Sequence, residues 1–147
     1  MTSYQEAIHQ VKDLFRKKFE APIDATHTER DLKDLMESPL FKQYIFSNNV
    51  ALIIDHSAFM YRYVSNNIED VLGISKSELM SNGLSKAMSI MHPDDVVALA
   101  PIFIKATEAI LSIPLTERPY LHFCYTMRYN TPKGLLRFYQ QTIPITL

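Results

Sequence analysis

Residues 49–95 decide the fold, and their sequence is NVALIIDHSAFMYRYVSNNIEDVLGISKSELMSNGLSKAMSIMHPDD. The run from Val50 to Ile54 is short, apolar and rich in β-branched residues, as is typical of a buried strand. Turn residues follow, and then an aromatic-rich run from Ala58 to Val64. Two such runs predict a β-hairpin, with Tyr61 and Tyr63 on one face and Arg62 on the other.

Two helix starts follow this hairpin. Asn66 is followed three residues later by Glu69, a spacing that predicts a capped helix closing at Gly73. Ser75 and Glu78 form a second capping box, which predicts another short helix. A turn is expected after it, because Asn-Gly is a strong turn signal.

The tetrapeptide His92-Pro93-Asp94-Asp95 predicts the start of a longer helix that runs towards Leu111. Asp94 and Asp95 suit this position, since negative charge is favourable at a helix N-terminus. Pro101 lies inside the same helix and is expected to kink it or to mark a late start, because proline lacks the amide hydrogen.

The flanks extend the pattern in both directions. Apolar spacing predicts a helix over 2–20 and a short helix over 29–36, whereas 40–46 fits a helix or a strand. Alternation over 120–129 and 135–145, joined by a turn, predicts a second hairpin. The predicted class is α+β: an antiparallel sheet flanked by short helices, with an N-terminal helical extension.

The N-terminal helix carries an apolar stripe with two open explanations. The stripe packs on its own domain, or it meets the same stripe of a second chain in a homodimer. The stripe residues that would form such a dimer are Tyr4, Ile8, Val11, Phe15 and Phe19.

Composition excludes several classes of protein. The 147 residues hold 15 basic and 16 acidic side chains, so no net field attracts nucleic acid or an acidic membrane. No apolar run approaches the ~18 residues of a membrane span. The single cysteine and the absence of a signal-like N-terminus favour a cytoplasmic protein.

The order of elements resembles a PAS sensor domain. Three segments carry the resemblance: Val50 to Asp55, Tyr63 to Gly73, and Met91 to Asp95, in this order and spacing. The resemblance implies an N-terminal helical extension and connector over 1–39 and a PAS-like domain over 40–147. PAS regions with a similar preceding helical segment occur in bacterial LuxR-type transcriptional regulators.

The resemblance also implies a departure. A PAS sheet has five antiparallel strands, and the sequence predicts four. The missing strand would be the last, which in the family lies between the first and the fourth. We therefore expect two unpaired strand edges, which another segment or another chain could fill. The expectation is that the chain is a piece of a longer protein.

Catalysis and metal binding have no support in the sequence. Adjacent carboxylates such as Asp94 and Asp95 diverge, whereas catalytic pairs must converge on one substrate. A metal site needs several converging ligands, and the five histidines are scattered. The chain is predicted not to be an enzyme and to hold no metal.

The cofactors of the family are not favoured, and no cofactor is assigned. The flavin-binding members carry a cysteine on the helix after the second strand, and 65–73 has none. The haem-binding members commonly use a histidine of the long helix, and 96–111 has none.

The aromatic interior is the remaining candidate site. Its residues either fill a close-packed core or line a cavity for a small apolar ligand. The candidate lining residues are Tyr61, Tyr63, Met88, Met91, Phe103, Phe123, Tyr125 and Phe138.

The resemblance implies a sensory or dimerisation module, most directly the regulatory domain of a bacterial transcriptional regulator. A ligand or partner would favour one arrangement of sheet and helices, and an attached output domain would respond to it. The alternative is the input domain of a sensor histidine kinase or a related signalling enzyme.

Overall fold

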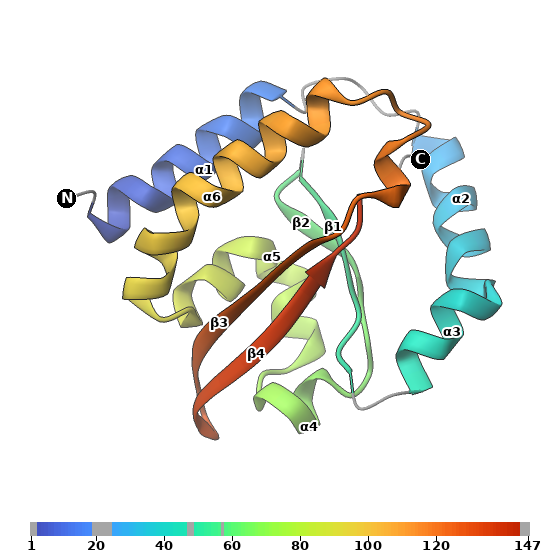
Figure 1. Ribbon diagram of the computed structural model, residues 1–147. Helices are drawn as coiled ribbons and strands as arrows, with labels where there is room; N and C mark the ends of the chain where they lie inside the picture. Colours follow the sequence, from blue (N-terminus) through green and yellow to red (C-terminus); the bar gives the residue numbers. More distant parts are fainter. Residues whose placement is uncertain (1–2, 19–24, 47–48, 57, 145–147) are drawn as a thin grey trace.

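The computed structural model describes residues 3–18, 25–46, 49–56 and 58–144, and it has the predicted α+β class (Figure 1). Its elements in chain order are α1 (Tyr4–Lys18), α2 (Ala25–Glu37), α3 (Pro39–Phe46), β1 (Leu52–Asp55), β2 (Met60–Val64), α4 (Ile68–Leu72), α5 (Lys76–Ile90), α6 (Pro93–Ser112), the 3-10 helix η1 (Arg118–Tyr120), β3 (Phe123–Thr131) and β4 (Gly134–Thr142).

The four strands form two separate antiparallel hairpins. β1 pairs with β2, and β3 pairs with β4 in a regular register from Phe123 opposite Thr142 to Thr131 opposite Gly134. No strand pairing joins the two hairpins within the described residues. The predicted hairpins are confirmed, and the described part of the chain supplies four strands, as expected.

The first hairpin departs from regular alternation. Ile53 lies opposite Tyr63 and Ile54 opposite Tyr61, so Arg62 is an extra residue in a β-bulge. Tyr61 is therefore buried together with Val64, while Arg62 is exposed. The prediction that Tyr61 and Tyr63 share a face was wrong, because a bulge shifts the phase of every side chain that follows it.

Each hairpin has one edge covered by other elements. The Leu84 amide donates to the Phe59 carbonyl beside β2, at 3.1 Å. The His92 amide donates to the Arg128 carbonyl at 2.9 Å, and Met91 forms an isolated bridge with Tyr129 of β3. β1 and β4 have no second strand neighbour among the residues that the structure describes.

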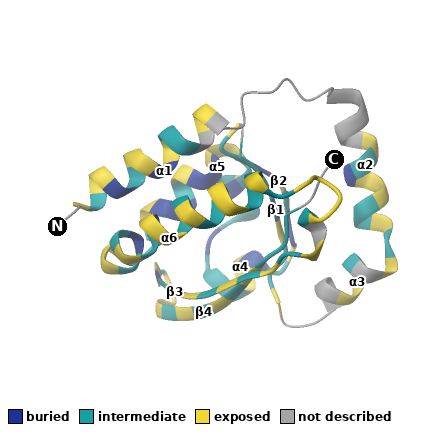
Figure 2. Ribbon diagram, turned by 45° about the horizontal axis from the view of Figure 1, so that its top comes forward, coloured by how far each residue is buried: buried dark blue, intermediate teal, exposed yellow. Residues whose placement is uncertain are grey.

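The core has two parts, visible as buried segments in Figure 2. One part joins β2, α4 and α5 and includes Tyr61, Val64 and Ile68. The other joins α1 to α5 and α6 through Ala7, Val11, Met88, Val96 and Ala100. α1 is thus built into the body of the protein, as Figure 1 also shows.

These contacts bear on the two explanations for the α1 stripe. Val11 is buried in the second core, Tyr4 and Ile8 pack against it, and the Tyr4 hydroxyl donates to the Met88 carbonyl at 2.8 Å. Packing within the chain is therefore observed for these three residues. The Phe15 side chain and Phe19 lie outside the described residues, and a homodimer through the stripe stays a prediction.

Several predicted helix ends are confirmed. The Glu78 amide donates to the Ser75 hydroxyl at 3.1 Å, and Gly73 closes α4 with a left-handed φ of 70°. His92 is the N-cap of α6, where its Nδ1 accepts from the Asp94 amide at 3.3 Å. Pro101 lies inside α6, which begins at Pro93.

Other predicted boundaries shift. Asn66 is not the cap of α4: that position is Asn67, whose side chain makes no capping hydrogen bond. α5 continues to Ile90 but is broken by non-helical backbone at Gly83, where the turn was predicted. The segment that fitted helix or strand is the helix α3, and α2 begins before residue 29.

Candidate functional site

Part of the predicted aromatic set meets on one face of the second hairpin. Phe103 of α6 lies over β3, with ring centroids 5.6 Å from Phe123 and 5.0 Å from Tyr125. The latter two rings are 5.1 Å apart. Phe138 of β4 stacks edge-on against Tyr129 at 5.6 Å. The contacts of Phe103 and of Phe138 are edge-to-face, and such pairs stabilise the interior beyond simple burial.

The other four predicted residues lie in different surroundings. Tyr61 is buried in the core beside β2, whereas Tyr63 packs edge-on against Phe41 of α3 at 5.3 Å. Met88 and Met91 contact the second core, between α1 and α6. The predicted set is therefore divided among four places, and lining of one cavity by all eight stays a prediction.

A cluster of tyrosines connects the two hairpins. Tyr61 of β2 and Tyr129 of β3 are each 6% exposed, and Tyr125 contributes to raising the pKa of both. Burial raises the pKa of Tyr125 to about 12 and raises the pKa values of Tyr61 and Tyr129 as well. All three phenols therefore stay neutral at physiological pH.

Sequence reasoning missed two members of this cluster. Neither Tyr129 nor Gln140 was named as a site residue. Gln140 lies opposite Tyr125 in the register, and its Nε2 donates to the Tyr129 hydroxyl oxygen. The alternation of each strand does not reveal this contact, because it depends on the register between the two strands.

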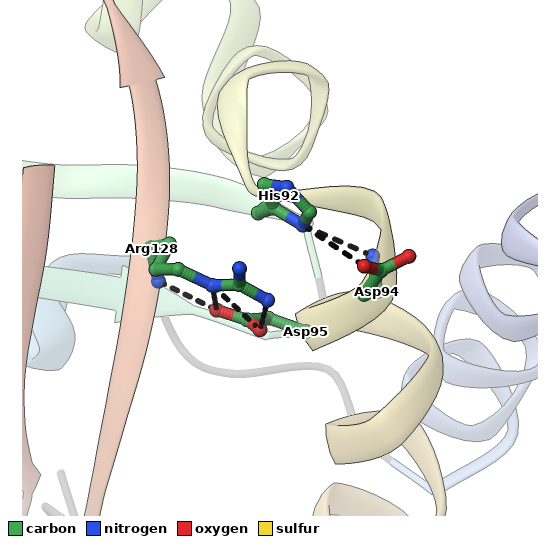
Figure 3. A network of polar contacts seen from close by, with 4 residues as sticks. All are labelled: His92, Asp94, Asp95 and Arg128. Atoms are coloured by element: carbon green, nitrogen blue, oxygen red, sulfur yellow. Dashed lines mark hydrogen bonds and ion pairs between the residues drawn. The ribbon is translucent and has the colours of Figure 1, made fainter. Parts of the chain in front are cut away.

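A polar network holds the start of α6 to β3 (Figure 3). The Arg128 guanidinium donates to both Asp95 carboxylate oxygens, with Nη2 to Oδ1 at 2.5 Å and Nε to Oδ2 at 3.1 Å. The Arg128 amide also donates to Oδ2, at 2.7 Å. His92 Nδ1 lies 3.8 Å from Asp94 Oδ2 in the adjacent pair.

Asp95 thus has a role that the sequence did not reveal. It was predicted to favour the helix N-terminus, but its carboxylate joins two elements that are 33 residues apart. The hydrogen bonds from the Arg128 side chain and amide, with its positive charge, lower the pKa of Asp95. No local sequence pattern shows this partner.

We expect Asp95→Asn to lower the urea midpoint at pH 7 and to have a smaller effect at pH 3. The lowered pKa means that the folded state favours the ionised carboxylate. The stabilisation is present above the unfolded-state pKa, about 3.9, and is lost as the pH falls through the folded value. Urea unfolding at both pH values tests this.

Asp94→Asn is the matched control, because the Asp94 side chain is 82% exposed. Its midpoint at pH 7 should fall by much less than that of Asp95→Asn. An equal loss for Asp95→Asn at pH 7 and pH 3 would show that the charge is not what matters.

A second polar network fixes the path from β2 into α4. Ser65 is fully buried, and its hydroxyl donates to Asn67 Oδ1 at 2.6 Å while accepting from the Ala51 amide at 3.0 Å. Asn67 Nδ2 donates to the Asn49 carbonyl at 3.0 Å. The Asn67 side chain therefore joins the start of α4 to the segment just before β1 and is not bonded to an amide of the helix.

An open groove of about 390 Å³ lies elsewhere, between α2 and β2. Its lining residues are Leu32, Lys33, Met36, Glu37 and Arg62. It contains none of the eight predicted cavity residues. Arg62 is paired with Asp55, since their Nη2 and Oδ2 atoms are 3.2 Å apart.

The described ranges lack the usual features of metal sites and of membrane-spanning helices. They contain no group of three or more histidine, cysteine or acidic side chains placed to hold a metal ion. None of the described helices combines the length and apolar character needed to cross a bilayer.

Comparison with protein-family models, with curated proteins and with solved structures finds no match to this chain.

Proposed function

We propose that this chain is a non-enzymatic sensory module, similar to a PAS domain, from the regulatory part of a bacterial transcriptional regulator. As such it would act in the cytoplasm. Its signal would be a small apolar ligand or a partner protein that changes how the hairpins and helices are arranged.

The observation that carries this proposal is the tyrosine cluster between two unjoined hairpins. Tyr61 and Tyr129 belong to different sheets. β2 packs on α5, whereas β3 contacts both α5 and α6 and is held to α6 by Asp95 and Arg128. A ligand that contacts both sheets would thus favour one relative placement of the two helices.

Homodimerisation is part of the same proposal. The dimer would form through the α1 stripe, through the edge of β1 or β4 that is open in the described part of the chain, or through both. Since Val11 is buried within the chain, the stripe would have to leave its present packing. Light scattering across a concentration series tests this part, and a strict monomer at high concentration would overturn it.

Native mass spectrometry of the purified protein tests ligand binding. We expect a retained small molecule, seen as a discrete mass increase that disappears on collisional activation. A homogeneous ligand-free mass, together with no shift in melting temperature across a library of small apolar compounds, would overturn the ligand-sensing proposal.

A further inference from the structure

Phe59, in the turn just before β2, has a backbone conformation that residues with a side chain rarely adopt. Its φ is 57°, and among the described residues other than glycine it alone has a positive φ. The Cβ atom crowds the backbone in this region, so a bulky residue there is an outlier. Such a conformation persists only where the surrounding structure holds the residue from several sides.

The kink of α5 holds the Phe59 backbone from one side. The Phe59 carbonyl oxygen accepts from the Leu84 amide at 3.1 Å. Gly83 lies so close that a Cβ atom added to it would be 2.5 Å from the same oxygen. A hydrogen bond and close packing therefore both fix this carbonyl, and a large change in the Phe59 backbone would break the bond to Leu84.

Helix α1 holds the Phe59 ring from the other side. Lys12 Nζ lies 5.4 Å from the ring centroid, within the range of a cation–π contact. The ring also packs against the second core, to which α1 contributes Ala7 and Val11. Among the partly buried residues of the described chain, Phe59 and Met91 pack against both cores. Phe59 thus contacts α1 with its ring and α5 with its backbone.

We infer that Phe59 is a latch, a strained residue that couples the docking of α1 to the path of the chain into β2. While α1 is docked, its contacts with the ring keep Phe59 at positive φ. When α1 leaves, Phe59 returns to an ordinary φ, and its carbonyl turns away from the Leu84 amide. The coupling is reciprocal, so a change that releases this turn also loosens α1.

The latch adds a route of transmission to the proposed sensory function. A signal that displaces α1 would reach the first hairpin through Phe59, and a signal that reshapes this hairpin would reach α1. This use of the latch rests on the proposed function, whereas the coupling between α1 and the Leu84 amide does not.

Amide hydrogen exchange followed by NMR tests the coupling from the surface of α1. Lys12→Gln removes the charge above the Phe59 ring and keeps a residue that favours helix. We expect exchange of the Leu84 amide to rise about twofold to fivefold, the range of an exposed cation–π contact, with no rise in β3 or β4. Lys17→Gln is the matched control, because Lys17 is also an exposed lysine of α1, and it should leave the Leu84 amide unchanged.

Two substitutions at position 59 separate the backbone strain from the ring. Phe59→Ala and Phe59→Gly both remove the ring, so both should speed exchange in α1. Glycine adopts a positive φ without strain, so exchange of the Leu84 amide should be about fivefold or more slower in Phe59→Gly than in Phe59→Ala. Phe41→Ala is the control, since Phe41 contacts Tyr63 of the same hairpin from α3, and it should leave exchange in α1 unchanged.

Several outcomes would overturn the latch. One is an unchanged Leu84 amide in Lys12→Gln, and another is an equal rise in Lys17→Gln. A rise of the same size in β3 and β4 would show a general loss of stability instead of coupling. Equal exchange of the Leu84 amide in the two variants at position 59 would remove strain from the mechanism. The lysine variants decide the coupling even if those at position 59 do not fold, and none of these results depends on a ligand.

Discussion

Replacing Gly83 with alanine is expected to destabilise the protein strongly. Gly83 has φ 59° and ψ −148°, a conformation that is essentially restricted to glycine. A Cβ atom there would lie 2.5 Å from the Phe59 carbonyl oxygen and 2.6 Å from Met60 Sδ. Strain and overlap together should cost about 3 kcal/mol or more.

Urea unfolding followed by circular dichroism measures this loss. Gly134→Ala is the matched control, since Gly134 also has positive φ, 104°, but a Cβ atom added there would meet nothing within 4 Å. Gly134→Ala should therefore show the backbone strain alone. If the two variants lose equal stability, then the close approach of α5 to the start of β2 is not what requires glycine at position 83.

The second large effect is expected at Ile68, the first residue of α4. Ile68 is completely buried and packs with Tyr61 and Val64 in the first core. Ile68→Ala leaves a cavity that neighbours of this kind fill only in part, so the loss should be about 2–5 kcal/mol.

Ile102→Ala provides the comparison for Ile68, because Ile102 is a helical isoleucine that is 47% exposed. Its loss of unfolding free energy should stay below that of Ile68→Ala by at least about 1 kcal/mol. Similar losses at the two positions would mean that α4 does not close the first core as described.

Features set by neighbours along the chain were predictable from the sequence. The Ser75 cap, the Gly73 helix end and the helix start at His92 each depend on a few consecutive residues. The alternation of β3 and β4 was also predictable, because a half-buried hairpin has a period of two. These local signals were sufficient for the α+β class.

Features set by distant contacts were not predictable. The bulge at Arg62 depends on how β1 aligns with β2. The residue at the N-cap of α4 is Asn67, whose side chain bonds to the distant Asn49 carbonyl. The Asp95–Arg128 pair joins positions with no shared local pattern. For the candidate site, the sequence indicated an aromatic interior. The structure was needed to show that Tyr63, Met88 and Met91 pack elsewhere.

The packing of α1 has a consequence for synthesis on the ribosome. Val11 and Ala7 are made early, but the partners that cover them, Val96 and Ala100, follow about 90 residues later. At roughly 5–20 residues per second, that interval lasts about 5–20 s. The apolar stripe of α1 therefore lacks these partners while the residues between them are being made.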